Sequence, residues 1–115
     1  MKIISTENAD HYKWGNICDG WHLLRSDNLS VIQEQMPSGT SEVPHYHNSS
    51  HQFFYVLSGE LSIDLDGEIH QLGARQGLEI RPKSKHKVFN DSTVEALFLV
   101  VSSPPSHGDR IPVAE

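Results

Sequence analysis

Turn signals recur about every ten residues along the chain, and the segments between them are too short for long helices. The clearest signal is Asp66-Gly67, which lies between two alternating runs and predicts a hairpin with a type I′ turn, where both central residues need a positive φ. No stretch of ten or more residues shows a convincing 3.6-residue periodicity. Short strands joined by turns, without helices, predict an all-β sandwich or barrel.

The strand candidates are short apolar or alternating runs bounded by Gly, Pro, Asn or Asp. They cover residues 11–14, 21–24, 29–36, 52–57, 61–65, 68–72, 78–81, 86–89 and 94–101. Asp19-Gly20 is interpreted as a turn between the first two strands. The last run, VEALFLVV, is continuously apolar and predicts a strand buried on both faces. The run 29–36 leaves open which of its two faces lines a cavity: that of Leu29, Val31, Gln33 and Gln35, or that of Ser30, Ile32, Glu34 and Met36.

Length and charge limit the kinds of protein that the chain can be. With 115 residues it is large enough for one domain with one core. The net charge of −6 argues against a nucleic-acid-binding or acidic-membrane-binding surface. The single Cys18 excludes an internal disulfide and suits a reducing compartment. The first 15 residues lack the apolar region of a signal peptide, and no apolar run is as long as a membrane span, so we expect a cytoplasmic protein.

Histidine is the residue type in excess, with eight in the chain. His45 and His47 are two positions apart, and on an extended strand residues two apart point to the same face. The connection 48–51 then returns the chain with Gln52 directed toward this pair. A third imidazole, His86, follows on a later strand. Imidazoles gathered on one face are ligands for borderline metal ions, so the sequence predicts a metal site assembled from separate strands.

The spacing of these residues resembles that of a known family, the cupins. The first cupin motif, G-x5-H-x-H-x4-[E/Q]-x6-G, is met by Gly39, His45, His47, Gln52 and Gly59. The second motif, G-x5-P-x-G-x2-H-x3-N, is matched at its end by His86 and Asn90. Its earlier positions differ, with Arg75 and Lys83 where Gly is usual and Arg81 where Pro is usual. The resemblance covers roughly residues 29–101.

The resemblance implies a small antiparallel β-barrel of the jelly-roll or double-stranded β-helix type, with a metal ion inside near one mouth. Residues 1–115 would form a single cupin domain, with a core at about 29–101, N-terminal strand pieces at 1–28 and a C-terminal surface arm at 102–115. Carried over position by position, it makes His45, His47 and His86 ligands of a divalent ion such as Zn, Fe, Mn, Ni or Cu. Gln52 occupies the position of the usual carboxylate ligand.

Gln52 leaves several arrangements open. As a ligand, its neutral carbonyl oxygen would leave more positive charge on the ion than a Glu would, which favours an acidic bound water and weaker retention of the metal. Alternatively, the ion keeps three His and open water positions. A bulge at 48–50 could instead turn His51 inward as the fourth ligand, although on a regular strand His51 points to the opposite face. In a final alternative the site holds no metal, and the pocket binds only a small molecule.

Strand parity predicts what surrounds this site. Phe54, Val56 and Val88 should point inward and form an apolar wall, as in most small-molecule sites. Trp14 and Trp21 are expected to cover one end of the core. The remaining histidines have no partner pattern and are assigned to the surface: His11, His22, His70 and His107. No pair of nucleophile and base is evident, and Cys18 has no local activating cluster.

Two functions from different classes fit these observations. One is a metalloenzyme acting on a small organic molecule, either an oxygenase or a Lewis-acid isomerase or cyclase, since small single-domain cupin enzymes of these kinds resemble this chain. The other is a non-catalytic module that binds or senses a sugar or metabolite. Residues 94–101 and the proline-containing tail provide more apolar strand than one small barrel covers, and small cupins commonly pair, so a homodimer is expected.

Overall fold

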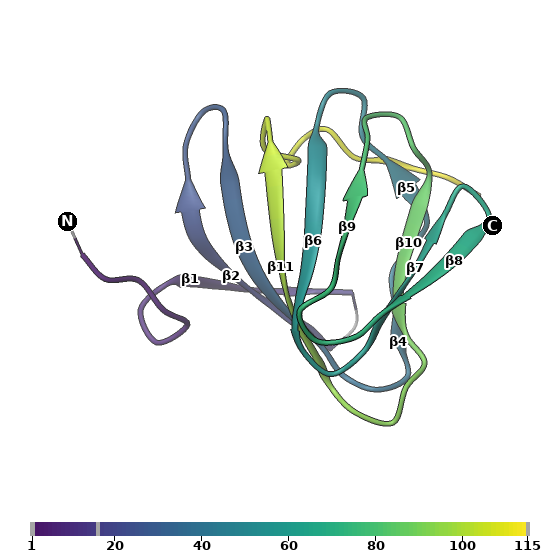
Figure 1. Ribbon diagram of the computed structural model, residues 1–115. Helices are drawn as coiled ribbons and strands as arrows, with labels where there is room; N and C mark the ends of the chain where they lie inside the picture. The colour runs from purple at the N-terminus through teal and green to yellow at the C-terminus, as the bar shows by residue number, and fades with distance from the viewer. Residues whose placement is uncertain (1, 16, 115) are drawn as a thin grey trace.

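A computed structural model describes residues 2–15 and 17–114, and these form twelve β-strands and no helix (Figure 1). From the N-terminus the strands are β1 (Asp10–Trp14), β2 (Cys18–Arg25), β3 (Ser30–Met36), β4 (Thr40–Ser41), β5 (His45–Tyr46), β6 (His51–Ser58), β7 (Leu61–Leu65), β8 (Glu68–Leu72), β9 (Gly77–Ile80), β10 (His86–Asn90), β11 (Ala96–Ser103) and β12 (Ile111–Pro112). The prediction of an all-β fold is confirmed. None of the described residues belongs to a helix long and apolar enough to cross a membrane.

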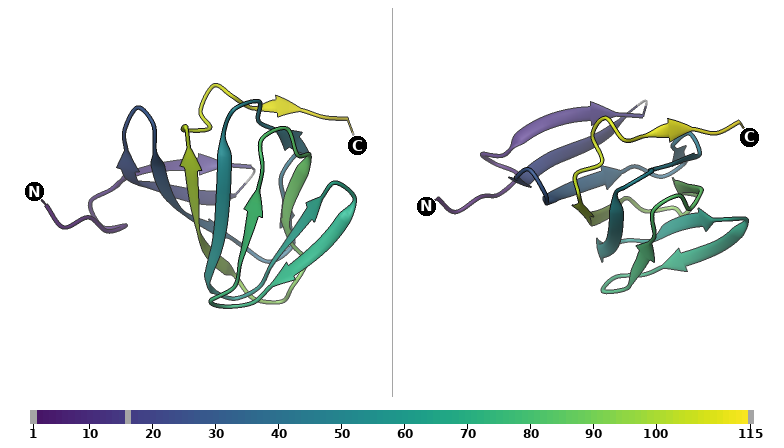
Figure 2. Two further views of the ribbon diagram at one scale, coloured as in Figure 1. Left: turned by 45° about the horizontal axis from the view of Figure 1, so that its top comes forward. Right: turned by 90° about the horizontal axis from the view of Figure 1, so that it is seen from above.

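The strands form two antiparallel sheets that curve around a common interior (Figures 1 and 2). The larger sheet has the order β1-β2-β3-β11-β6-β9, and the second has the order β12-β5-β10-β7-β8, with β4 also pairing with β10. Non-consecutive strands are neighbours in both sheets, as in a jelly roll. Within each sheet, strands far apart in the sequence are therefore paired, and residues from distant strands meet in the interior.

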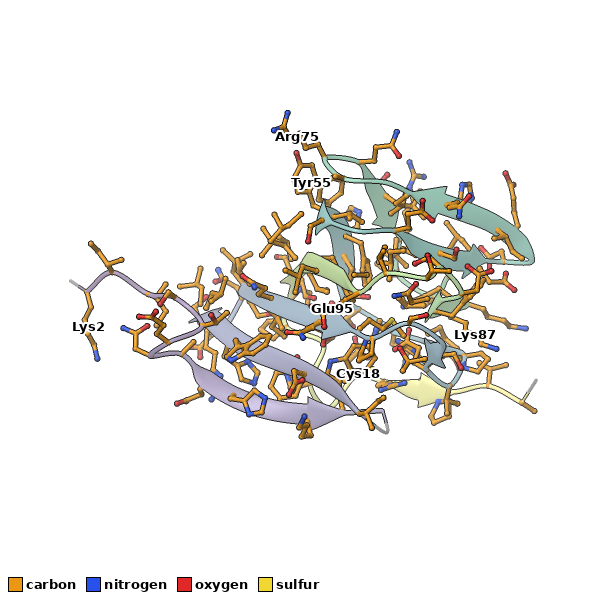
Figure 3. All side chains as sticks on the ribbon, turned by 90° about the horizontal axis from the view of Figure 1, so that it is seen from below. Lys2, Cys18, Tyr55, Arg75, Lys87 and Glu95 are labelled. Carbon is orange, nitrogen blue, oxygen red and sulfur yellow. The ribbon has the colours of Figure 1, made fainter. Side chains whose placement is uncertain are left out.

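The hydrophobic core lies between the sheets and is built from alternate residues of the strands. Its fully buried side chains include Phe98, Val56, Leu61, Ile63 and Val88. Side chains at the other strand positions point away from the barrel, as Figure 3 shows for Tyr55 of β6, while Cys18 is buried. Phe54, Val56 and Val88 are buried, so the inward orientation expected for them is confirmed.

The last long strand differs from its prediction. β11 begins at Ala96 rather than Val94, and its residues alternate between buried and half-buried up to Ser102. The interpretation of this run as buried on both faces is therefore wrong. In a barrel with no second layer outside it, only one face of a strand meets the core, and the apolar residues on the other face remain half-exposed.

Backbone conformation at the turns follows the sequence in one place and departs from it in another. Asp66 and Gly67 have φ angles of 51° and 90°, which confirms the predicted hairpin turn. Arg75 and Lys83, which occupy Gly positions of the second motif, also have positive φ, at 67° and 69°. The left-handed backbone of the motif is thus kept although the glycines are not.

The N-terminal strands extend the larger sheet, and the turn expected at Asp19-Gly20 is not there. Both residues lie within β2, where Gly20 pairs with Tyr12 of β1 on one side and Glu34 of β3 on the other. A Cβ atom at Gly20 would overlap the ring of Tyr12. The glycine is explained by this close approach of a side chain rather than by a turn.

The C-terminal segment lies against the chain's own barrel. Ser102 and Ser103 belong to β11, and Ile111 and Pro112 form β12, which pairs with β5. Seen from above, the segment runs along the mouth of the barrel (Figure 2). The expected surface arm therefore contributes to the region where the metal site was predicted.

Candidate metal centre

The three predicted histidine ligands meet at one end of the barrel. His45 begins β5, His47 follows that strand, and His86 begins β10 directly opposite His45 in the register. Their ring centroids are 4.4 to 5.4 Å apart, and one nitrogen from each ring lies within 4.8 Å of the other two. All three side chains are buried, with at most 5% of their surface exposed. This spacing suits coordination of a single ion.

Backbone carbonyls determine which nitrogen of each ring is available. Nδ1 of His45 donates to the carbonyl of Val43 at 3.0 Å, and Nδ1 of His86 donates to that of Ser84 at 2.9 Å. Nδ1 of His47 donates to the carbonyl of Asp109 at 2.7 Å. Because a carbonyl oxygen can only accept, each Nδ1 carries the proton, and each neutral ring keeps a lone pair on Nε2.

Burial keeps these rings neutral. Loss of hydration lowers the pKa of His45 to about 3 and that of His86 to about 4. The pKa of His47 is lowered for the same reason. At neutral pH all three rings therefore have an unprotonated Nε2, which is the form that binds metal.

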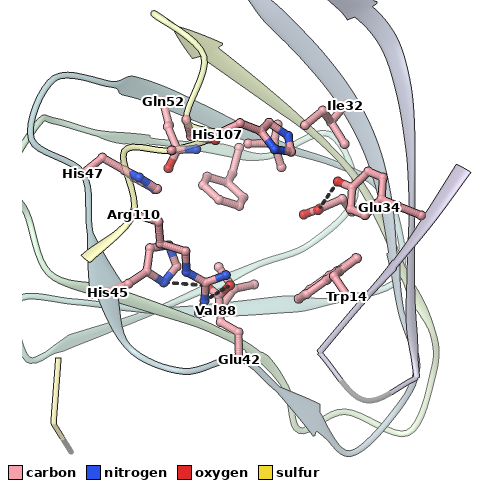
Figure 4. A pocket seen from close by; sticks show the side chains of 15 residues that line it. Trp14, Ile32, Glu34, Glu42, His45, His47, Gln52, Val88, His107 and Arg110 are labelled. Atoms are coloured by element: carbon pink, nitrogen blue, oxygen red, sulfur yellow. Dashed lines mark hydrogen bonds and ion pairs between the residues drawn. The ribbon is translucent and has the colours of Figure 1, made fainter. Parts of the chain in front are cut away.

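Gln52 completes the site from β6. Its amide Nε2 donates to Oγ of Ser102, the paired residue on β11, at 3.0 Å. This bond leaves the amide oxygen facing the cavity (Figure 4). The neighbouring His51 points to the outer face, where it pairs with Glu79 at 2.6 Å, as expected for a regular strand.

The donor set fits a divalent metal ion. Among the described residues, two of the buried polar atoms without a hydrogen-bond partner are Nε2 of His86 and Oε1 of Gln52. Buried polar atoms are rarely left unpaired, because each one loses its hydration. A cation between the rings would pair both atoms. Three imidazole nitrogens with one amide oxygen is a set that suits zinc and its first-row neighbours.

The C-terminal segment holds the connection between the ligand-bearing strands. The carboxylate of Asp109 accepts hydrogen bonds from the backbone N–H groups of Asn48, Ser49 and Ser50 at 2.9 to 3.0 Å. These bonds lower the pKa of Asp109. The sequence pattern did not identify Asp109, because its partners lie about 60 positions earlier in the chain.

A cavity of about 290 Å³ opens beside the histidines (Figure 4). Its volume is at the lower end of the range for small-molecule sites. Phe54 and Val88 contribute to the apolar wall, as predicted. The full lining comprises Tyr12, Trp14, Ile32, Glu34, Glu42, His45, His47, Gln52, Phe54, Val88, Val100, Ser106, His107, Gly108 and Arg110.

Two carboxyl groups in this cavity were missed by sequence reasoning. Oε1 of Glu42 accepts from the backbone N–H of Val88 at 3.0 Å, and Oε2 lies 3.7 Å from the guanidinium of Arg110. Burial raises the pKa of Glu42 to about 8. Glu34 shares the inner face of β3 with the buried Ile32, which settles the open question of which face of that strand lines the cavity.

The remaining histidines follow the surface assignment only in part. His11 is exposed and His70 is half-buried. His22 is also half-buried, its Nδ1 is buried, and its ring lies 5.2 Å from that of His107. His22 is therefore only partly at the surface. His107 is exposed but is one of the residues that line the cavity beside His45 and His47.

Fold and site together define a jelly-roll barrel with three buried histidines at one mouth. A family model described as "Cupin domain" matches residues 31–102, more than half of the chain. The chain belongs to the cupin family, and the resemblance stated from its motifs is confirmed.

Similar proteins include one of nearly the same length. An uncharacterized protein of Methanocaldococcus jannaschii, MJ1618, is 32% identical over 118 residues, covering 95% of this chain and 94% of that protein. Polyketide synthase CurC of Streptomyces cyaneus is 43% identical over 60 residues, which is 52% of this chain but only 39% of CurC. The polyketide cyclase RemF of Streptomyces resistomycificus has a similar structure, with a TM-score of 0.83 and 20% identity over 100% of this chain and 87% of RemF. At this identity the likeness to RemF shows a shared fold.

Proposed function

We propose that His45, His47 and His86 bind a divalent metal ion, with Gln52 as a fourth ligand or a close neighbour. One observation carries the proposal: three Nε2 lone pairs converge inside the barrel, each oriented by a backbone carbonyl on the opposite side of its ring. The unpaired Nε2 of His86 supports it further.

We further propose that the protein is a Lewis-acid isomerase or cyclase acting on a small carbonyl compound. A divalent ion at such a site polarises carbonyl groups and lowers the pKa of bound water. The chain's own part is to orient the substrate against the apolar wall of Phe54 and Val88 and to present the cation of Arg110 to substrate oxygen atoms. The donor set carries no negative charge, which favours this type of chemistry. The similar proteins CurC, a polyketide synthase, and RemF, a polyketide cyclase, agree with a substrate containing several carbonyl groups.

The first experiment measures metal binding. Protein purified without chelators is analysed for metal content, and its affinity is measured by competition against a chelator. Wild type should bind one equivalent. His86→Ala should lose stoichiometric binding but keep a β-type circular dichroism spectrum, because the apolar strands rather than the ion hold the barrel together. His70→Ala serves as the matched control, because His70 lies outside the cluster.

Unchanged metal content in His86→Ala would show that this ring is not a ligand. A wild-type protein that takes up no added metal, yet binds small carbonyl compounds, would favour the non-catalytic binding module instead. Turnover of carbonyl compounds that depends on added metal would support the enzyme.

A further inference from the structure

One wall of the metal-site cavity carries a carboxyl group that coordination of the ion does not use. Glu34 lines the same cavity as His45, His47 and Gln52. Figure 4 shows it on the opposite side of the cavity from these residues, between Ile32 and Trp14. A molecule that contacts the histidines and fills the cavity would therefore also contact Glu34.

The sheet places a tyrosine on this carboxyl group in a specific way. Tyr12, Gly20 and Glu34 occupy one row across β1, β2 and β3. The ring of Tyr12 passes over Gly20, at the place where any Cβ atom would overlap it. Its hydroxyl then donates to Oε2 of Glu34 at 2.7 Å. The missing side chain at the middle of the row is what allows the outer residue to reach the inner one.

The environment of Glu34 suits a group that exchanges protons near neutral pH. Burial raises its pKa to about 7. The charged or titratable groups that interact with Glu34 are the Tyr12 hydroxyl, the Arg110 guanidinium, the Glu42 carboxyl and the Cys18 thiol. Burial also keeps the Tyr12 hydroxyl in its neutral form. The Tyr12 hydroxyl is its one hydrogen-bond partner within the chain that the structure describes, so Oε1 is free to meet a bound molecule.

We propose that Glu34 is the proton acceptor and donor for a substrate bound beside the three histidines, and that Tyr12 positions it. The substrate class is a carbonyl compound with an acidic hydrogen, such as a 1,3-dicarbonyl compound in its keto or enol form. This inference rests on the proposed function, because it assigns a role within the same site.

The proton step is balanced without any further reactant. The C–H or enol O–H bond of the substrate breaks, and its electron pair stays on the substrate as an enolate. The proton forms a new O–H bond on Oε1 of Glu34. The enolate oxygen atoms face the histidine cluster and Arg110, and return of the proton to another atom of the substrate completes an isomerisation. General acid–base catalysis of this kind is most effective when the pKa of the group is close to the working pH.

Isothermal titration calorimetry with 2,4-pentanedione as the probe tests the role of Glu34. Metal-loaded protein is titrated at pH 8 in two buffers of different ionisation enthalpy, which gives the number of protons released to the buffer for each probe bound. Glu34 is then roughly nine-tenths ionised and can take up the enol proton. Glu34→Gln cannot, so it should release about one proton more per bound probe than wild type. The matched control is Glu68→Gln, at an exposed position on β8, which should behave like wild type.

Tyr12→Phe tests the positioning role. Loss of its hydrogen bond leaves the Glu34 carboxylate less stabilised, so the pH at which proton uptake appears should move upward. A purely structural role for Tyr12 would leave that pH unchanged.

Metal content measured before and after each titration separates the possible failures. Wild type without metal would overturn the proposed function, and this inference with it. Metal-loaded wild type and Glu34→Gln that release equal numbers of protons would overturn the inference alone. Loss of probe binding in Glu34→Gln with metal retained would also overturn it, and would assign Glu34 to binding.

Discussion

The backbone carbonyl of Asp109 accepts a hydrogen bond of 2.7 Å from Nδ1 of His47, across 62 positions of the chain. The same residue uses its carboxylate to hold the backbone of residues 48–50, between His47 and Gln52. One residue of the C-terminal segment therefore orients the ring of a proposed metal ligand and fixes the loop behind it. Partners that orient a ligand in this way commonly affect metal affinity as well.

Asp109→Ala should weaken metal binding by about tenfold, within the range found when orienting partners of ligands are removed. The reason is that three loop N–H groups lose their acceptor, and the loop that carries His47 becomes less ordered. Competition against a chelator measures the change. Asp27→Ala, at an exposed position that does not line the cavity, is the control. Equal affinities for Asp109→Ala and wild type would show that the backbone carbonyl alone holds the ring.

Local signals predicted the fold well because barrel strands and turns are encoded over short distances. The Asp66-Gly67 turn could be predicted because few residues adopt positive φ, and the inward orientation of Phe54 and Val88 followed from strand parity alone. The prediction for residues 94–101 failed, because the sequence does not show whether a second layer covers a strand.

The candidate site could be predicted only where its residues follow a motif. His45, His47 and Gln52 are close in the chain, and their spacing identified them. Glu34 and Asp109 reach the site through strand order and through the path of the C-terminal segment, which no local pattern records. Gly20 was interpreted as a turn residue, because a glycine that makes room for a distant ring has the same sequence signal as one that bends the chain.

Lys83→Gly should stabilise the protein by roughly 0.5–1 kcal/mol. Lys83 has a φ of 69°, and this left-handed conformation costs a residue with a Cβ atom about 1–2 kcal/mol. Glycine avoids that cost. Its greater freedom in the unfolded chain offsets only part of the resulting stabilisation. Urea unfolding measures the difference. Lys85→Gly is the matched control: Lys85 is not among the residues with positive φ, so the same change should destabilise there. A loss of stability in both variants would contradict the prediction.

Glu34→Gln should change how stability depends on pH. The pKa of Glu34 is raised to about 7 in the folded protein, from 4.5. The folded state therefore binds the proton of Glu34 more tightly than the unfolded state does. Protonated Glu34 stabilises the fold below pH 4.5, and this stabilisation is lost as the pH rises through 7. The loss is up to about 3 kcal/mol, less where water in the cavity solvates the carboxylate.

Urea unfolding of wild type and Glu34→Gln at several pH values from 4.5 to 8 tests this. The free energy of unfolding of the variant should rise relative to that of wild type as the pH rises, and the difference should become constant above pH 7. Contributions from other groups cancel in this comparison. A difference that does not vary with pH would mean that Glu34 titrates normally.

The outer face of β6 and β11 should form the interface of a homodimer. Phe53 and Leu57 on this face are 44% and 40% exposed, and Tyr55, Leu97 and Leu99 beside them are half-buried. An apolar face of this kind can pair with the same face of a second copy about a two-fold axis. Light scattering should give twice the monomer mass for wild type and the monomer mass for Phe53→Glu. Ile69→Glu, at an exposed apolar residue on β8, should remain dimeric. A monomeric wild type at micromolar concentration would contradict the prediction.

Gln52→Glu tests the position at which the chain departs from the family motif. The amide oxygen of Gln52 is buried without a partner, so a glutamate there would place a negative charge next to the three rings. At an effective dielectric constant of about 20, opposite charges a few ångströms apart attract by several kcal/mol, partly offset by the loss of hydration of the carboxylate. Because about 1.4 kcal/mol corresponds to a factor of ten, metal affinity should increase at least tenfold.

The same substitution should make folding depend more strongly on the metal. Without an ion, the new carboxylate is buried beside three neutral rings and the Ser102 hydroxyl, so the metal-free variant should be less stable than metal-free wild type. Chelator competition and thermal unfolding, each at fixed pH and salt, measure the two effects. Gln71→Glu, an exposed position on β8, is the control for the added charge. Tighter metal binding, together with lower stability of the metal-free variant, would show that Gln52 faces the ion. Equal affinities would mean that the site consists of the three histidines and solvent.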